Sequence, residues 1–431
     1  MTNATIIISL AVTLIAGLAM SRVVKRIGLP AVTGYLVAGL LIGPYCLGQL
    51  GVDGLGFVSY ESVKSFDIIS EVALGFIAFT IGNEFRLSDL KQIGKQAVVV
   101  GILETIAATV AVDIALIGLH FILGEDKLPM SAALILGAIA SATAPAATLM
   151  VVRQYKAKGP VTSILLPIVA LDDAVGLMVF ELSFGIAVSL TDSVNVVVML
   201  VKPMLEIVIS IVGGGLLGYL FTKSEQFFHS RSKRLAVSVT FVFVTIGLSL
   251  MKIRLFGMEL GFSSLLSCMM LGTVFCNTCD FSNELMERVD RWTAPLLILF
   301  FVLSGAELQL SVFLDKAALL IGVVYILSRC AGKYLGCYWG AELMHCDDNV
   351  RKYLGITMFP QAGVALGMSL IALQRFPGAE GLLIRNIVLF GILIYELVGP
   401  TLTKISLMKA GEIQKEDRKS SRMSNTEMPT R

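Results

Sequence analysis

The sequence has little charge for its length, and this scarcity excludes most soluble enzymes. Of 431 residues, 15% are charged and 56% are hydrophobic, whereas about a quarter of the residues in a soluble domain are charged. The net charge is only +2, and no basic stripe with interleaved aromatic residues occurs, which excludes a nucleic-acid binder. The seven cysteines are scattered, which argues against a secreted disulfide scaffold. Since a P-loop, a nucleophile elbow and a cofactor fingerprint are also missing, we expect neither an enzyme nor a bound cofactor.

Long apolar runs separated by short charged clusters are what the sequence does contain. A bilayer core of about 30 Å needs about 20 apolar residues per helix. The sequence therefore predicts an all-α polytopic membrane protein with about 13 transmembrane helices. The first run has no basic segment before it, so we interpret it as a retained helix and not as a cleaved signal. The predicted spans are 4–21, 30–48, 66–84, 97–122, 131–152, 161–189, 197–222, 235–251, 258–277, 293–312, 317–341, 353–374 and 384–407.

The distribution of Lys and Arg predicts the orientation, because these residues collect in cytoplasmic loops. With the N-terminus outside, 24 of the 34 basic residues fall inside, seven of them in the C-terminal segment 404–431. Only Arg329 and Lys333 are left in the middle of the membrane. The C-terminus is then inside, and the polar tail 408–431 is predicted to be disordered. The eight basic residues expected outside are Lys64, Lys127, Lys202, Lys252, Arg254, Lys316, Arg375 and Arg385.

Two predicted spans are interrupted by proline at matching places, at Pro145 in 131–152 and at Pro360 in 353–374. Proline removes a helical hydrogen bond, and in lipid the freed carbonyls need partners in a cavity or in packed protein. The spacing of the two breaks predicts two six-helix repeats with one linker helix between them. The repeats then have opposite orientations, with their broken helices crossing, as in many secondary transporters.

Charged residues occur in the middle of several spans, where each is expensive and points to function. Asp172 and Asp173 lie in the sixth span and Glu104 in the fourth, whereas Arg329 and Lys333 share one face of the eleventh. Three acids against two bases leave one negative charge, which could hold a proton or a monovalent cation. Because both ligands need the same carboxylate oxygens, they compete, and that competition is the basis of antiport.

The motifs together resemble the sodium/proton exchangers of the monovalent cation:proton antiporter superfamily, and in particular the branch with two adjacent aspartates. The resemblance runs in order over about residues 5–407. Its motifs are the double aspartate in 171–174, the break around Thr143 and Pro145, the segments 305–307 and 331–333, the break 360–366, and the second-helix pattern 29–44.

This resemblance implies roles for individual residues. Asp173 matches the aspartate that binds the ion and carries the proton, and Asp172 matches its neighbour, which pairs with a lysine, in this chain Lys333. Glu104 and Arg329 match an acid–base pair that ties the repeats together in some members. Thr143 would lend an oxygen to a sodium ion held at Asp173 and Asp172. The sequence departs from many electroneutral relatives at Ala144, where they have an aspartate.

The resemblance also implies the domain organisation. Residues 1–407 would form one membrane domain in the plasma membrane, with core helices in about 97–189 and 317–407. Scaffold helices in about 4–84 and 235–312 would form a homodimer interface, and 197–222 would be the linker. The Gly332, Gly336 and Gly340 repeat predicts close helix packing beside Lys333.

The leading interpretation is exchange of Na⁺ or Li⁺ for H⁺, electrogenic and serving pH homeostasis. A K⁺/H⁺ antiporter of the same fold, a cation-gated sensor or channel, and a sodium-coupled organic-anion symporter remain alternatives. An intramembrane aspartyl protease fits poorly, because adjacent aspartates cannot flank a peptide bond. Cys276 and Cys279 have the spacing of a metal or redox motif, but lack a second pair, so we expect idle thiols.

Overall fold

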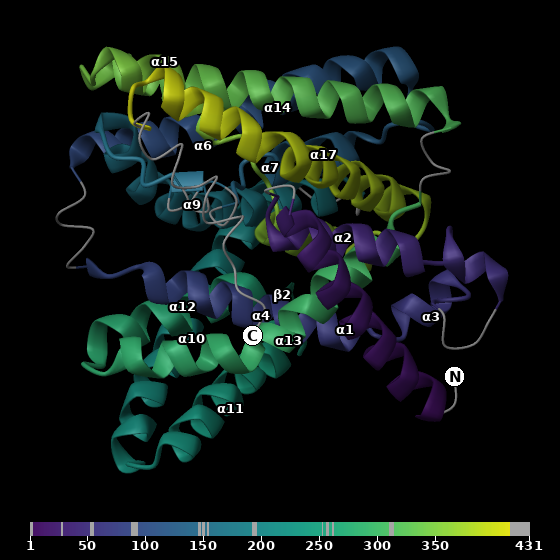
Figure 1. Cartoon of the computed structure of the whole chain (residues 1–431), viewed down its shortest axis with the longest axis vertical. Coiled ribbons are helices and arrows are strands. Elements are labelled where there is room, and N and C mark those ends of the chain that lie inside the picture. Colours follow the sequence, from purple (N-terminus) through teal and green to yellow (C-terminus); the bar gives the residue numbers. More distant parts are fainter. Residues whose placement is uncertain are drawn as a thin grey trace.

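A computed structural model of the chain is almost entirely helical (Figure 1). It describes residues 3–26, 29–51, 56–87, 94–144, 148, 151–152, 155–191, 196–251, 253–255, 258–260, 263–309 and 314–413. Several side chains within these ranges, including that of Asp173, lie outside the described part.

One group of helices, called the α14 bundle, lies at one end of the molecule (Figure 1), where α6, α14, α15 and α17 pack together. Because these helices are apolar on more than one face, each can bury residues against several neighbouring helices, as expected inside a membrane protein. The members of the bundle are α6 (Lys95–Leu123), α7 (Met130–Ile139), α9 (Pro160–Thr191), α14 (Lys316–Leu343), α15 (Asp348–Thr357), α16 (Gly363–Arg375) and α17 (Ala379–Lys409).

A second group, called the α13 bundle, occupies the opposite end, where α12 packs on α4, α13 on α2 and α1 on α2 (Figure 1). Its members are α1 (Asn3–Arg26), α2 (Ala31–Ile42), α4 (Asp67–Glu84), α11 (Arg231–Ser249), α12 (Ser264–Thr278) and α13 (Ser282–Glu307). The long helix α10 (Val196–Phe227) packs on both α9 and α12, and so joins the bundles. Two short helices, η1 (Leu47–Leu50) and α3 (Tyr60–Lys64), connect α2 to α4.

Eight of the described helices are long and apolar enough to cross a membrane, and α9 makes a ninth if its two segments, bent by 44°, are one span. Three shorter apolar helices, α7, α12 and α16, accompany them. Each of the thirteen predicted ranges overlaps at least one of the described helices, and 353–374 covers parts of both α15 and α16. The all-helical membrane fold predicted from the sequence is therefore confirmed.

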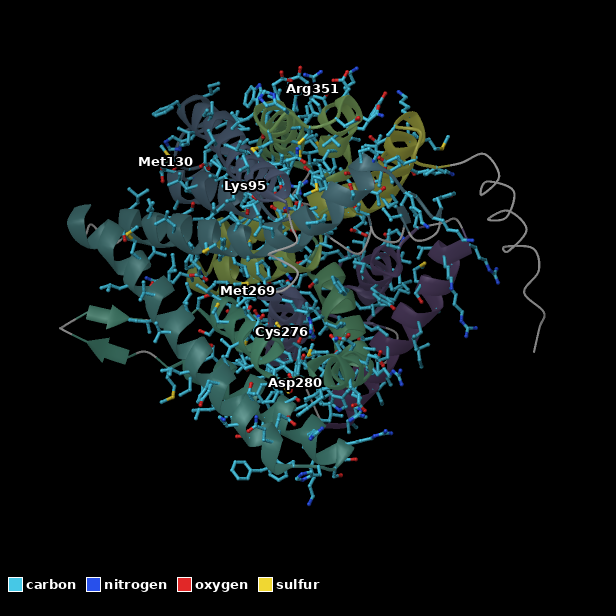
Figure 2. The ribbon with its side chains drawn as sticks, turned by 90° about the vertical axis from the view of Figure 1, so that its left-hand side faces the viewer. Lys95, Met130, Met269, Cys276, Asp280 and Arg351 are labelled. Carbon is cyan, nitrogen blue, oxygen red and sulfur yellow. The ribbon has the colours of Figure 1, made fainter. Side chains whose placement is uncertain are left out.

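Several predicted boundaries were wrong by more than a turn. The span predicted at 258–277 begins only at Ser264, because residues before it form an antiparallel hairpin of β1 (Ile253–Leu255) and β2 (Met258–Leu260). This hairpin projects from the helices (Figure 2). The span predicted at 293–312 begins at Ser282, since its polar first turns continue the helix without a break.

The C-terminal segment is ordered further than predicted. The helix α17 runs to Lys409, and the Glu412 side chain, 5% exposed, accepts hydrogen bonds from the amides of Val161 (2.6 Å) and Thr162 (2.9 Å). The carboxylate thereby satisfies amides that have no partner within the first turn of α9. Residues 408–413 of the predicted tail are therefore ordered against the helices, and residues 414–431 lie outside the described part.

Glycines bring α6 and α14 into backbone contact. A Cβ on Gly336 would lie 2.5 Å from the Glu104 Cα, and one on Gly332 would lie 2.7 Å from the Ala108 Cα. A Cβ on Gly340 would lie 3.0 Å from the Val100 Cα. The predicted close-packing face of α14 is confirmed, and it fixes how near the α14 side chains come to Glu104.

Candidate ion-binding site

Two interrupted helices meet in the middle of the α14 bundle. The helix α7 ends at Ile139, and the α15–α16 pair is interrupted between Thr357 and Gly363. The amide of Ala144, in the first break, donates a hydrogen bond of 2.8 Å to the carbonyl of Pro360, in the second. The predicted crossing of broken helices is therefore confirmed, although Pro145 itself lies outside the described residues.

Polar side chains close the same crossing from both helices. The hydroxyl of Thr148 donates to the carbonyl of Thr357 at 2.9 Å, and the amide of Gln361 donates to the carbonyl of Ile139 at 2.8 Å. The hydroxyl of Tyr325 on α14 in turn donates to the Gln361 side chain at 3.2 Å. The carbonyls that each break frees thus find partners within protein, as a break at membrane depth requires.

Arg329 ties the two breaks to α14. Its guanidinium donates to the carbonyls of Ala140 (2.9 Å) and Ala142 (2.7 Å) in one break and of Phe359 (2.6 Å) in the other. It also lies 4.6 Å from the ring centroid of Tyr395 on α17. Two helix C-termini, each with partial negative charge, therefore face this fully buried cation.

A cluster of two acids and one base lies directly beside the crossing. Lys333 Nζ lies 3.0 Å from Asp172 Oδ2 and 2.8 Å from Glu104 Oε2, and all three side chains are fully buried. The ammonium also donates to the carbonyl of Ser141 in the α7 break. The hydroxyl of Thr105 donates to Asp172 Oδ1 at 2.6 Å. The structure thus pairs Asp172 with Lys333, as expected.

The expected pairing of Glu104 with Arg329 was wrong. Glu104 faces Lys333 because the close approach of α6 at Gly336 sets it opposite that turn of α14. Arg329 lies one turn nearer the N-terminus of α14 and reaches the breaks instead. The contact between Lys333 and Glu104 is an ion pair without hydrogen-bond alignment, and Glu104 Oε1 has no hydrogen-bond partner among the described residues.

The corrected pairing changes the local charge balance. Arg329 is compensated by carbonyl dipoles, so Asp172 and Glu104 share the single ammonium of Lys333 among the described side chains of this cluster. When both acids are ionised, one negative charge is left over in a buried site. A proton or a cation would neutralise it.

The two remaining predicted ligands lie next to this cluster in the chain. Thr143, 2% exposed, is in the α7 break, and its hydroxyl donates to the carbonyl of Met358 at 3.4 Å. Asp173 follows Asp172 in α9, and its side chain lies outside the described residues.

Three residues with notable contacts in the structure were not predicted from the sequence. Thr105 binds Asp172 and could have been found, since it adjoins Glu104 on the buried face of α6. Asp113, also on α6, directs Oδ1 toward Gly137 of α7, where a Cβ would lie 1.8 Å from it. Arg385, expected at the outer end of the span 384–407, is 1% exposed and pairs with Glu307 at 2.8 Å.

The CxxC motif begins at Cys276 in the last turn of α12 (Figure 2), a helix of the α13 bundle, whereas the cluster lies in the α14 bundle. Cys276 donates to backbone carbonyls, including that of Thr273 at 3.2 Å, and Cys279 is 6% exposed. Among the described residues no group of three His, Cys, Asp or Glu side chains could hold a metal ion.

The corrected pair yields a stability prediction. In a double-mutant cycle of Glu104→Gln and Lys333→Met, we expect a coupling of about 1–3 kcal/mol, because removing one partner strands a buried charge. The matched cycle of Glu104→Gln and Arg329→Met should be additive to within about 0.5 kcal/mol. Thermal unfolding of the purified variants measures both. A larger coupling in the second cycle would restore the pairing that the sequence suggested.

Comparison with known proteins identifies the family. The family model described as "Sodium/hydrogen exchanger, transmembrane" matches residues 10–409. The chain belongs to this family. It is therefore a multi-span membrane transporter that exchanges a cation for protons, and not an enzyme.

Relatives of this exchanger include proteins named for different cations. It is 24% identical over 392 residues to the high-affinity Na⁺/H⁺ antiporter NhaS3 of Synechocystis sp., covering 84% of this chain and 81% of the relative. It is also 24% identical over 387 residues to the ammonium/H⁺ antiporter subunit AmhT of Alkalihalophilus pseudofirmus, covering 89% and 91%.

The fold of the exchanger is that of a solved antiporter. The structure of the sodium proton antiporter MjNhaP1 from Methanocaldococcus jannaschii superposes with a TM-score of 0.74 at 17% identity, covering 93% of this chain and 97% of that chain. The fold class predicted from the sequence is thereby confirmed independently of the helix count.

Proposed function

We propose that this exchanger moves Na⁺, or Li⁺, against H⁺ by competitive binding at Asp173, with Asp172 and Thr143 as neighbouring ligands. The observation that carries the proposal is the buried Asp172–Lys333–Glu104 cluster beside the crossing of the broken helices. A buried charge is costly unless it is paired. Asp172 and Glu104 already outnumber the one base of the cluster, so Asp173, next in the chain, would add a charge that favours occupancy by either a proton or a cation.

The chemistry of the crossing suits a small hard cation. Carboxylate, hydroxyl and carbonyl oxygens are the ligands that such cations prefer, and the α7 break supplies Thr143 and nearby carbonyls to the same region as Asp172. The α7 break itself, residues 140–144, consists mainly of small residues, which argues against an organic-anion symporter. A gated channel would need binding without exchange, and family membership favours exchange.

We further propose that transport is electrogenic through Lys333. Exchange of one H⁺ for one Na⁺ moves no net charge, so a second proton carrier is required. Lys333 holds Asp172 and Glu104 together. A cation that draws Asp172 away from this ammonium would leave Lys333 next to an added positive charge, and releasing its proton would restore the local balance.

The domain organisation supports alternating access by relative movement. The α14 bundle contains the whole cluster, and the α13 bundle lies beside it as a separate group of helices. We propose that the α14 bundle is the moving core and that the α13 bundle is the scaffold and homodimer surface, with α10 as linker. Such rocking of one bundle against another is common in transporters with inverted repeats.

Proton flux in proteoliposomes tests the proposed function. Na⁺, Li⁺, K⁺ and NH₄⁺ are added in turn, with and without a clamp on the membrane potential. We expect flux with Na⁺ and Li⁺ that responds to an imposed potential. Flux with K⁺ alone would favour the K⁺/H⁺ alternative, and flux with NH₄⁺ alone would favour the activity for which AmhT is named. Cation-independent proton leak would contradict exchange.

A further inference from the structure

Arg385 is a buried cation that joins the two bundles. It lies on α17, and its guanidinium donates to Glu307 Oε2 (2.8 Å) and Ser304 Oγ (3.1 Å), both on α13. It also donates to the carbonyl of Leu366 and to Ser369 Oγ, both at 2.7 Å and both on α16. Two of its four partners therefore belong to the α14 bundle and two to the α13 bundle.

Other polar contacts join the bundles at the same end. The Asn386 side chain, next in the chain, accepts a hydrogen bond of 2.8 Å from the amide of Gln309. Gln374 at the end of α16 donates to Glu71 on α4 at 2.8 Å. This is the end where α13 and α16 finish and α17 begins, which the Lys and Arg distribution predicts to be outside.

The two helices of the interrupted α15–α16 pair pack differently. The helix α15 packs against α14, α17 and α9, all in its own bundle, whereas α16 also packs against α4 of the α13 bundle. A Cβ on Gly367 of α16 would lie 2.5 Å from Leu74 of α4. The two bundles are thus tightly apposed around α16 and Arg385, at the end predicted to be outside.

Relative movement of the bundles would divide the partners of Arg385. Leu366 and Ser369 would travel with it, whereas Glu307 and Ser304 would stay behind. Arg385 is 1% exposed and Glu307 is 4% exposed, so separating them without new partners leaves two buried charges, which is strongly unfavourable. The outer end therefore opens only when this pair is solvated or exchanged.

We propose that Arg385 and Glu307 form a clasp that holds the outer end closed and sets the ratio of inward-open to outward-open exchanger. The inference rests on the proposed movement of the α14 bundle against the α13 bundle. Arg385 is in this view a positioning residue, because it contacts the two bundles and not the Asp172–Lys333–Glu104 cluster. Weakening the clasp should raise the outward-open population without changing the ion ligands.

Thiol labelling tests the clasp without requiring transport. Leu74→Cys places a thiol on α4 against α16, where Leu74 is 4% exposed. An impermeant thiol reagent is applied from the outer face, and site-specific peptide mass spectrometry follows that cysteine alone. In the Glu307→Gln and Arg385→Gln variants we expect labelling to be about fivefold faster or more. The double variant should be no faster than the quicker single, because both break one clasp.

The matched control is Glu225→Gln. Glu225 is a fully buried carboxylate 4.0 Å from Arg234, but this pair joins α10 to α11 and does not cross between the bundles. Labelling at Leu74→Cys should stay unchanged in it. Ser304→Ala keeps both charges and removes the longest of the four hydrogen bonds of Arg385. The labelling rate of this variant should be intermediate, and it replaces the charge variants if those fold poorly.

Transport supplies a second readout. A larger outward-open population should lower the Na⁺ KM at the outer face and raise it at the inner face by a similar factor. Unchanged labelling in Glu307→Gln, Arg385→Gln and Ser304→Ala would overturn the clasp even if exchange is normal. Faster labelling in a protein that shows no cation/proton exchange would keep the clasp and remove the proposed function.

Discussion

Asp173→Asn should reduce cation-driven proton flux to the level of empty liposomes, a loss of about 100-fold or more. Asparagine keeps the size of the side chain, but it cannot bind a proton in the working pH range and it offers a cation no charge. Both halves of the exchange therefore fail together. Flux in proteoliposomes measures the loss, and size-exclusion elution shows whether the variant is folded.

Asp113→Asn is the matched control for this variant. Asp113 is another aspartate within a predicted span, but it faces Gly137 between α6 and α7, apart from the cluster. Its replacement should leave flux within about twofold of the wild type, because Asp113 lies about two and a half helical turns from Glu104 along α6 and is not one of the proposed ion ligands. Near-normal Na⁺-dependent flux in Asp173→Asn would require another ion-binding residue.

Lys333→Arg should abolish the response of exchange to membrane potential. Guanidinium pairs with carboxylates as ammonium does, but it does not deprotonate in proteins, so only one proton could be exchanged for each Na⁺. The clamp experiment should show Na⁺ exchange that no longer follows an imposed potential. Lys333 is fully buried between α6 and the α7 break, so there is little space for the larger Arg side chain.

Lys333→Gln is the companion variant, because it removes the charge without adding volume. It should also lose the response to potential, and it should be less stable, because Asp172 and Glu104 then face each other without a base. If Lys333→Arg still exchanges Na⁺ at a rate set by the potential, Lys333 is not the second proton carrier. Glu104 would be the next candidate, since its Oε1 has no hydrogen-bond partner among the described residues.

The sequence predicted the features of this protein that depend on local pattern. Long apolar runs located the helices, and Pro360 marked a break that the structure places against the other one at Ala144. The double aspartate and Lys333 were expected to lie together, since charges in the middle of a span must find partners. These inferences require only that a helix in a bilayer is apolar and that its buried polar groups find protein partners.

Two predictions about the tertiary placement of side chains were wrong. Glu104 could have paired with either base of α14, and the choice followed from the contact of α6 with α14 at Gly336. Arg385 was expected at the outer surface, because it stands at the start of the predicted span 384–407. The helix α17 in fact begins at Ala379, one and a half turns earlier, which buries Arg385 against Glu307.

The central claim is that a proton and a cation compete for one carboxylate, and the Na⁺ KM measured across a range of pH tests it most directly. Competition predicts that the KM rises as the pH falls, approaching about tenfold per pH unit at the acid end, while the maximal rate stays constant. A KM that does not change with pH, with a maximal rate that does, would show that protons act elsewhere and would contradict the account.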